Sequence, residues 1–476
     1  GMGGTLSYTG MEVVSLALGS GNDTLTIAST IAGGPTTVTT GDGNDTVLVQ
    51  GTGPGATSVT TGAGDDLVRI GDGPGAVGGR LVHITGPLAV SGSTGTDRLV
   101  FDATGATLDL VGTITATQVS GFEMAGVVTY DGVEDLTVSL GSGADQVAVV
   151  STSATTNVLT GAGDDQVTVN PGAVDGTANA LAGRLNIDGQ AGADVTTVNL
   201  FGNGDSRIDV VDSDGAHTVV VNGTPESDVL LMRANALAGL VAALTVKVGA
   251  WYTHAEKISY QRGITQVVLN TLAGDDYLAF DDTAAPIVAN LGAGRDAVHI
   301  GQLYTDPQGA IRSIDAEFGV HLTANSGFDS SRGLLSDGVH YATTVNGGDD
   351  NDVFQVFRNQ GPLQLNGDDG DDIFVVRAFV TAASVTSYDS NIDTHIAGGD
   401  GSNYIEYSMN APVHIDGGSG HDLLVVVGTE LDDTFVITAT GVFGSGLQVD
   451  FTNVEELAIY GLEGDDNFYV LSTSAS

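Results

Sequence analysis

The chain of 476 residues contains no cysteine, one tryptophan and only 14 basic residues. The absence of cysteine excludes disulfide bonds and metal sites built from thiolates. The scarcity of lysine and arginine argues against nucleic acid as a partner, because phosphates need basic side chains to neutralise them. No apolar run reaches the roughly 18 residues of a membrane-spanning helix, and the start shows no secretion signal. We therefore expect neither nucleic-acid binding nor membrane insertion.

Acidic residues and glycine are abundant instead. The chain has 59 aspartates and glutamates, a formal charge of −45, 70 glycines and 41% apolar residues. This apolar content is too high for a disordered acidic chain, and the apolar residues recur in alternation. The composition predicts a folded protein whose turns are built from Gly, Asp and Asn.

One phrase organises the sequence. "LGSGNDTLTI" (18–27) returns as "TGDGNDTVLV" (40–49), "TGAGDDLVRI" (61–70) and "TGAGDDQVTV" (160–169). Each phrase ends in alternating apolar residues, as a strand with one buried face does. Aligned on the last acid, the phrases give a column of sixteen residues: Asp23, Asp45, Asp66, Asp97, Asp145, Asp165, Asp194, Asp228, Asp276, Asp296, Asp352, Asp372, Asn403, Asp422, Asp433 and Asp466.

A repeat of about 20 residues with two or three short strands is typical of one coil of a parallel β-helix. We therefore predict an all-β fold, a parallel β-helix or β-roll solenoid with longer interrupting loops. The segment 235–248 suits either a short helix or a strand. The predicted divisions are solenoid modules at 1–120, 121–225, 226–301 and 346–476, with an irregular insertion or a boundary at 302–345.

A longer repeat is superimposed on the short one. Residues 6–23 resemble 128–145, residues 222–231 resemble 427–436, and residues 258–280 resemble 449–470. Duplication of this kind elongates a body. The aromatic residues at matched positions are expected in the core: Tyr8, Tyr130, Tyr260 and Phe451.

The Gly-x-Gly-x-Asp turn suits calcium chemically. Glycine reaches positive φ, so the backbone can aim its carbonyls at one point, and aspartate adds an anionic oxygen. Calcium takes six to eight oxygens, which two turns stacked one coil apart could share. A metal-free interpretation stays open, because Asp and Asn after glycine also cap nearby N–H groups.

Some phrases are more specific. "GGSGHDLLV" (417–425) and "GGDGSNYIE" (398–406) resemble the glycine-rich nonapeptide of bacterial RTX calcium-binding repeats, as do looser versions through most of the chain. The resemblance implies bound Ca²⁺, an exported bacterial protein, and a likeness to giant repetitive surface proteins and adhesins. The implied metal ligands are Asp23, Asp45, Asp66, Asp97, Asp145, Asp165, Asp194, Asp276, Asp296, Asp352, Asp372, Asp422 and Asp466.

The sequence also departs from RTX arrays. Those arrays carry two such turns per coil, whereas this chain usually carries one, so one edge at most would hold a continuous ladder. The ladder is expected to be interrupted between Asp97 and Asp145. The turns before Asp228 and Asp433 have lost glycines and are expected to hold no metal.

Signals for catalysis are few. The chain has no H-E-x-x-H, G-x-S-x-G or phosphate-loop motif. The cluster "WYTHAEKISYQR" (251–262) unites the single Trp with basic residues, and we interpret it as an ordinary coil end whose aromatics cover the core. His83 and His299 are interpreted as solvent-facing or packing residues rather than ligands. We predict that the protein is not an enzyme.

The sequence thus favours a calcium-stabilised structural or adhesive segment of a large protein on the bacterial cell surface. Its expected partners are calcium ions, neighbouring modules or copies of itself, and surface glycans. Two alternatives stay open. One is a β-helical polysaccharide lyase or hydrolase with its site near 251–262 or 302–345, and the other is a metal-free or filament-forming solenoid.

Overall fold

The computed structural model describes residues 10–73, 78–172, 180–249, 251–304, 329–330, 333–377, 394–408, 413–444 and 447–473. The chain forms two compact units. The first extends to residue 173 and includes 179–198 and 206–217, and the second includes 199–205 and 218–476. The described residues form strands and turns, which confirms the predicted all-β class. Within these ranges no helix is long and apolar enough to cross a membrane.

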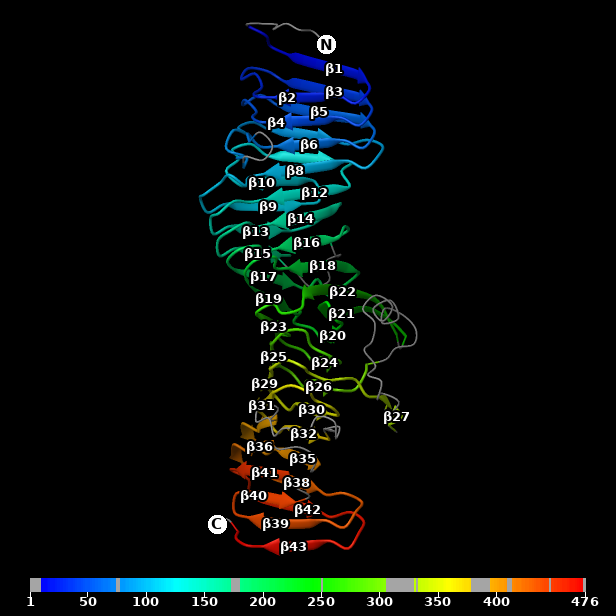
Figure 1. The fold of residues 1–476 in the computed structure, drawn as a ribbon, viewed down its shortest axis with the longest axis vertical. Coiled ribbons are helices and arrows are strands. Elements are labelled where there is room, and N and C mark those ends of the chain that lie inside the picture. Colours follow the sequence, from blue (N-terminus) through cyan, green and yellow to red (C-terminus); the bar gives the residue numbers. More distant parts are fainter. Residues whose placement is uncertain are drawn as a thin grey trace. The chain divides into compact units, whose positions relative to one another are not determined.

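Two sheets of short, mainly parallel strands run through each unit, and we call them sheet A and sheet B (Figure 1). In the first unit sheet A contains β1 (Val14–Ser20), β3 (Thr36–Asp42), β5 (Thr57–Ala63), β7 (Leu88–Ser91), β11 (Val128–Asp131), β10 (Gln118–Gly121), β9 (Val111–Thr115), β13 (Gln146–Val149), β15 (Gln166–Val169) and β17 (Ala193–Asn199). Sheet B contains β2 (Thr24–Ile27), β4 (Thr46–Val49), β6 (Leu67–Ile70), β8 (Arg98–Asp102), β12 (Asp135–Ser139), β14 (Thr155–Leu159), β16 (Leu185–Asp188) and β18 (Ser206–Val211).

The second unit is built in the same way. Its sheet A contains β19 (Ala216–Asn222), β23 (Gln266–Asn270), β25 (Ile287–Ala293), β29 (Thr343–Asp349), β31 (Leu363–Asp369), β33 (Thr394–Ala397), β34 (Asp400–Gly401), β36 (Val413–Asp416), β37 (Ser419–Gly420), β41 (Leu447–Thr452), β40 (Gly441–Gly444), β39 (Thr434–Thr438) and β43 (Asn467–Val470). Its sheet B contains β22 (Trp251–Gln261), β21 (Ala238–Val248), β20 (Val229–Ala234), β24 (Tyr277–Phe280), β26 (Ala297–Ile300), β30 (Val353–Val356), β32 (Ile373–Val376), β35 (Tyr404–Ser408), β38 (Leu423–Val427) and β42 (Glu456–Tyr460). A separate pair is β27 (Asp329–Ser330) with β28 (Gly333–Leu334).

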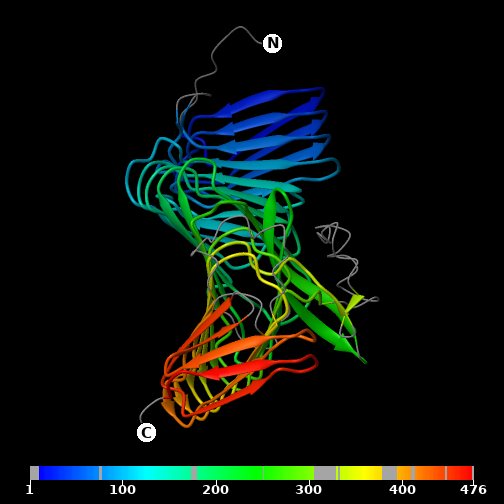
Figure 2. The ribbon, with the colours of Figure 1, turned by 60° about the horizontal axis from the view of Figure 1, so that its bottom comes forward.

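The alternation in the sequence explains the core. In β4, Val47 and Val49 are fully buried while their neighbours are half-buried, and β6 and β30 repeat the pattern. Parallel strands pair in register, so identical positions stack from coil to coil. The rings of Phe354 and Phe374, for example, are stacked with centroids 4.7 Å apart. Figure 2 shows these coils from a second side.

Each Gly-x-Gly-x-Asp turn lies at one edge of a coil, and the edge changes within each unit. From Asp23 to Asp97 the turns connect sheet A to sheet B. From Asp145 on, they connect sheet B to sheet A. In the second unit the turns from Asp228 to Asp422 connect A to B, and the last two connect B to A. A glycine-poor turn introduces the change in both units, at 105–110 and at 428–433.

Three antiparallel meanders explain the longer sequence repeat. They are β9–β10–β11, β20–β21–β22 and β39–β40–β41. After each meander the chain crosses to the other sheet, forms one strand and returns through a Gly-rich turn. The returning strand then pairs in parallel with the first strand of the meander, as β13 does with β9, β24 with β20 and β43 with β39. The matched aromatics Tyr130, Tyr260 and Phe451 are buried as predicted, and Tyr8 lies outside the described residues.

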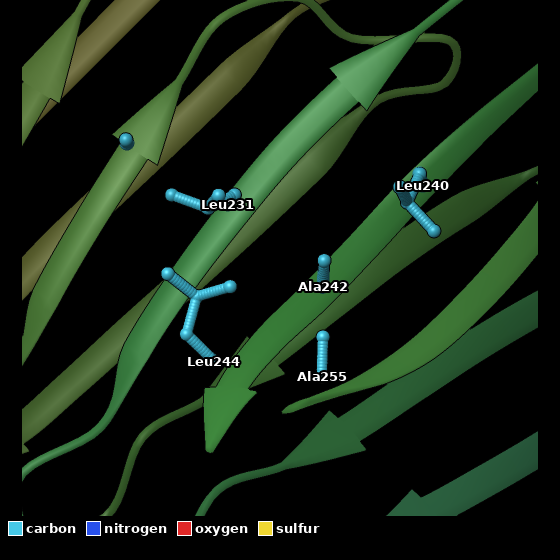
Figure 3. Close-up of a cluster of buried hydrophobic side chains, with 6 residues drawn as sticks. Leu231, Leu240, Ala242, Leu244 and Ala255 are labelled. Atoms are coloured by element: carbon cyan, nitrogen blue, oxygen red, sulfur yellow. The ribbon is translucent and has the colours of Figure 1, made fainter. Parts of the chain in front are cut away.

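The second meander carries an additional apolar cluster. Figure 3 shows this cluster on neighbouring strands, and its members are Leu231, Leu240, Ala242, Leu244, Ala255 and Ala279. Consecutive residues along β20 and β21 are buried, so both faces of these strands are covered. The segment 235–248, which suited a helix or a strand, therefore forms a strand over Ala238–Val248.

Gly239 tests how tightly this meander packs. Gly239 and Tyr260 are paired across β21 and β22, and a Cβ on Gly239 would lie 2.1 Å from Cζ of the buried ring. We expect Gly239→Ala to destabilise the second unit by about 1–3 kcal/mol, the usual cost of overpacking. Chemical denaturation would measure it, with Gly33→Ala as control because nothing described lies within 4 Å of a Cβ there. Equal stability of the two variants would contradict this packing argument.

The region 302–345 interrupts the coils without displacing them. Strands β25 and β29, which flank it, pair directly in parallel, and β26 pairs with β30 in the same way. This arrangement is that of an insertion leaving one coil and returning to the next. Most of the insertion, 305–328 and 331–332, lies outside the described residues.

Candidate functional site

The column of aspartates forms hydrogen-bonded rows inside the turns. The backbone N–H of Asp45 donates to Oδ1 of Asp66 in the next coil at 2.7 Å, and the N–H of Asp352 donates to Oδ1 of Asp372 at 2.8 Å. These side chains are at most a few per cent exposed except near the ends of the rows. We call this arrangement an inner row. It satisfies turn N–H groups that no strand pairing reaches.

Four inner rows contain every aspartate predicted as a metal ligand. Their members, in the order in which each N–H donates to the next side chain, are Asp23, Asp45, Asp66, Asp97 and Glu134 in row one; Leu110, Asp145, Asp165 and Asp194 in row two; Asp228, Asp276, Asp296, Asp352, Asp372, Asn403, Asp422 and Glu455 in row three; and Asp433 and Asp466 in row four. The structure thus brings neighbouring members of a row together and separates the rows by the change of edge.

An outer row of hydrogen bonds runs in the opposite direction at the residue before many of these aspartates. The N–H of Asp65 donates back to Oδ1 of Asn44 in the preceding coil at 3.0 Å, and the N–H of Ser402 donates back to Asp371 at 2.7 Å. The same bond joins Arg295 to Asp275 at 3.0 Å. These side chains face solvent, so both acids of a G-x-x-D-D turn cap backbone groups, one toward each neighbouring coil.

The second carboxylate oxygen, Oδ2, of many inner-row aspartates accepts no hydrogen bond from a described residue. Among the described residues Oδ2 is buried without a hydrogen-bond partner in Asp45, Asp66, Asp145, Asp165, Asp194, Asp276, Asp296, Asp352, Asp372 and Asp422. Burial is the first cause that raises the pKa of three of them, to about 8 for Asp352, about 7 for Asp276 and about 6 for Asp372. Neighbouring carboxylates in the row raise it further. A buried anion without a partner is costly, so this oxygen favours a proton or a cation.

At most of these aspartates the residue five positions earlier is threonine or glycine. Where it is threonine, its hydroxyl donates to the next coil, as Thr160 does to the carbonyl oxygen of Gly189 at 2.7 Å. Where it is glycine, Oδ2 occupies the place of the missing side chain. A Cβ on Gly367 would lie 2.1 Å from Oδ2 of Asp372 and 2.3 Å from the carbonyl oxygen of Gly398. Glycine there thus creates a small space between a carboxylate and a carbonyl.

Asn403 shows how a neutral group fills the same position. Its Oδ1 accepts from the N–H of Asp372 at 2.9 Å, like an aspartate of the row. Its Nδ2 donates to the carbonyl oxygen of Gly417 at 3.2 Å. A protonated aspartic acid has the same donor and acceptor pattern. The row is therefore compatible with neutral members.

The donor set fits calcium at some turns and not at others. A buried Oδ2 without a described partner, a glycine five positions earlier and a carbonyl oxygen of the next coil meet at Asp352, Asp372 and Asp422. At Asp97, Asp228 and Asp433 a backbone N–H already donates to Oδ2, from Ser93, Thr224 and Thr429. No three His, Cys, Asp or Glu side chains in the described ranges gather as metal ligands. Calcium would therefore take most of its oxygens from carbonyls.

Sequence reasoning did not identify the residues that end the rows. Glu134 accepts from the N–H of Asp97 at 2.8 Å, and Glu455 accepts from that of Asp422 at 2.9 Å. They lie where the chain passes the edge without a glycine turn, and glutamate's extra methylene supplies the missing reach. Both stand four residues after the matched aromatic, Tyr130 or Phe451, and this spacing was the available signal.

Residues 251–261 of the cluster form β22 rather than a coil end, and Arg262 follows in a turn. Glu256 is buried there and accepts from the N–H of Phe201 at 3.0 Å, and its burial raises its pKa to about 7. Trp251 is exposed. Of the histidines interpreted as packing or solvent-facing, His299 bonds the Tyr277 hydroxyl at 2.7 Å and His83 is exposed beside Asp72.

The chain matches no family model, and no curated protein shows significant sequence similarity to it.

Proposed function

We propose that this chain is a structural or adhesive β-solenoid segment of a large exported bacterial surface protein, stabilised by calcium in its glycine-rich turns. The observation that supports the proposal is the set of buried Oδ2 atoms repeated along the rows, each lacking a described hydrogen-bond partner. Rows of buried carboxylates repel one another unless protons or cations compensate them. The resemblance of the turns to RTX repeats favours calcium as the cation.

Calcium would be held first at Asp352, Asp372 and Asp422, together with carbonyl oxygens such as those of Gly367 and Gly398. Its binding free energy would add to the folding free energy. In this proposal the low calcium concentration inside a cell leaves the fold less stable, which eases export, and the higher concentration outside stabilises it. The solenoid then supplies length and rigidity.

A metal-free solenoid is the second candidate, and Asn403 favours it. Its amide satisfies the same backbone groups without any cation. In that case protonated aspartates would take the same role along the rows. The two candidates differ in their response to calcium.

We expect calcium to raise the unfolding midpoint of chelator-treated protein, whereas magnesium at equal concentration does not. At a calcium concentration a hundredfold above Kd the stabilisation is about 2.7 kcal/mol per site. Circular dichroism and calorimetry would measure it. The triple variant Asp352→Asn, Asp372→Asn, Asp422→Asn should lose most of the response.

The matched control is the triple variant Asp45→Asn, Asp66→Asn, Asp165→Asn. In these turns the residue five positions before the aspartate is threonine instead of glycine. It should keep the response. If chelated protein melts at the same temperature with and without calcium, and calorimetry detects no binding, the calcium proposal is wrong and the metal-free solenoid is favoured.

A further inference from the structure

Two segments of the second unit meet at the edge opposite row three. One is the turn 235–237 between β20 and β21 with the end of β22, and the other is the insertion after β26. Both lie next to the loop 281–286, where the chain passes from sheet B to sheet A between β24 and β25. Binding sites in repetitive folds commonly lie on such loops, held by a rigid scaffold.

The bases of these segments are tied together by a buried ion pair. Nε of Arg233 lies 2.8 Å from Oδ2 of Asp281, and both side chains are almost inaccessible. Nη2 of Arg233 donates to the carbonyl oxygen of Tyr304 at 2.8 Å, and the N–H of Tyr304 donates back to Asp281 at 3.2 Å. This pair fixes the geometry of the loops around it.

His340 stands beside this pair with one nitrogen held and one presented to solvent. Its Nδ1 lies 2.5 Å from Oδ1 of Asp282, whose side chain is nearly buried. The hydroxyl of Thr283 accepts from the N–H of both His340 and Tyr341, at 3.0 and 3.1 Å. The imidazole is 37% exposed, so Nε2 is available to a ligand.

Arg262 supplies an uncompensated positive charge next to His340. Its guanidinium donates to the carbonyl oxygen of Asn235 and lies 5.9 Å from the ring centroid of Tyr341. Among the described arginines, Arg262 and Arg295 are those with no carboxylate oxygen within 4.0 Å. In a chain of charge −45 such an arginine is unusual.

The nearby acids are already engaged. Asp282 faces His340, and Asp337 lies 3.2 Å from Arg358 and accepts from Gln360 at 3.0 Å. The charged groups that face His340 are therefore Asp282, Asp337 and Arg262. The hydrogen bond to Asp282 is the main cause that raises the pKa of His340. The raised pKa favours the protonated imidazole.

We propose that Arg262 and His340 form a binding site for the carboxylate of a uronic acid unit in an acidic glycan. The planar guanidinium pairs well with a carboxylate, and Nε2–H of the imidazole adds a second charged donor. Tyr341 offers a half-buried aromatic surface of the kind that packs against a sugar ring. A glycan suits this site better than a protein, since its chain needs only a few polar contacts on exposed loops. The inference is independent of calcium in the rows.

The test is calorimetric titration of the whole chain with trigalacturonate, with EDTA present so that calcium cannot bridge the ligand to the turns. Neutral galactotriose serves as the ligand control. We expect trigalacturonate to bind and Arg262→Gln to weaken it at least tenfold, because a charge-assisted pair is lost. Arg295→Gln, which removes the other unpaired arginine at the opposite edge, should leave binding unchanged.

Protonation of His340 gives a second readout. Binding should be severalfold tighter at pH 6 than at pH 8, and His340→Gln should remove this difference while keeping the protein folded. Arg262→Lys keeps the charge without the planar fork and should bind with intermediate strength. Absence of trigalacturonate binding to folded wild-type protein, equal binding of galactotriose, or equal losses in Arg262→Gln and Arg295→Gln would each overturn the proposal.

Discussion

Metal-free protein should unfold at a higher temperature at pH 5 than at pH 8, the reverse of ordinary acid denaturation. Burial raises the pKa of several inner-row aspartates in the folded state, to about 8 for Asp352, about 7 for Asp276 and about 6 for Asp145. The unfolded value is about 3.9. The folded state therefore binds more protons between these limits, and stability falls as the pH rises through them.

Asp352→Asn should raise the stability of metal-free protein at pH 8. The amide keeps the acceptor for the N–H of Asp296 and removes the buried charge, as Asn403 already does two positions along the same row. One pKa unit corresponds to about 1.4 kcal/mol, so we expect a gain of about 2 kcal/mol or more. The measurement is denaturant unfolding at pH 5 and pH 8 in the presence of a chelator.

The control for this prediction is the solvent-facing Asp371→Asn, which changes the same net charge in the outer row. It should alter stability little at either pH. Calcium should abolish the advantage of Asp352→Asn at pH 8, because protons and calcium compete for the same oxygens. A wild-type protein that is equally stable at pH 5 and pH 8 without metal would show that the inner rows are not protonated.

Gly41→Ala should destabilise the first unit by more than about 3 kcal/mol, whereas Gly19→Ala should cost about 1–2 kcal/mol. Both glycines occupy the same turn position in successive coils, with φ of +105° and +115°. A Cβ on Gly41 would lie 1.7 Å from the carbonyl oxygen of Gly19. Nothing described lies within 4 Å of a Cβ on Gly19.

The comparison separates two causes that usually act together. Both variants pay the backbone strain of alanine at positive φ, and only Gly41→Ala must also push a coil away from its neighbour. Thermal and denaturant unfolding of the two variants measure the difference. If they lose equal stability, the glycines are required for backbone conformation alone and close stacking of the coils does not depend on them.

The sequence predicted the regular parts of this protein well. Alternation after each acid located strands such as β2, β4 and β30, and the period of about 20 residues implied stacked parallel coils. Both signals are local and recur many times, so errors at one coil are corrected by the next. The position of the thirteen predicted aspartates in four rows follows from the same period.

The remaining features depend on contacts between distant residues. The meander β20–β21–β22 was not predicted because its strands are antiparallel, and because β20 and most of β21 are buried on both faces, so the alternation is lost there. The Gly-rich turns move from one edge of the coils to the other after the turns at 105–110 and 428–433. No residue type in these two turns predicts that change. The neighbourhood of Arg262 and Tyr341 joins residues 79 positions apart, which no local pattern connects.

The division of each unit into two rows limits how far a local defect affects the fold. Each row is a short chain of identical links, and Glu134 or Glu455 closes the first row of its unit. An error in one link, such as a charged carboxylate in place of a neutral one or an unfavourable substitution, is transmitted only to neighbouring links. The change of edge therefore confines the effect of such an error to one row. A failure in one row stops at the closing glutamate, and the coils beyond it keep their own links.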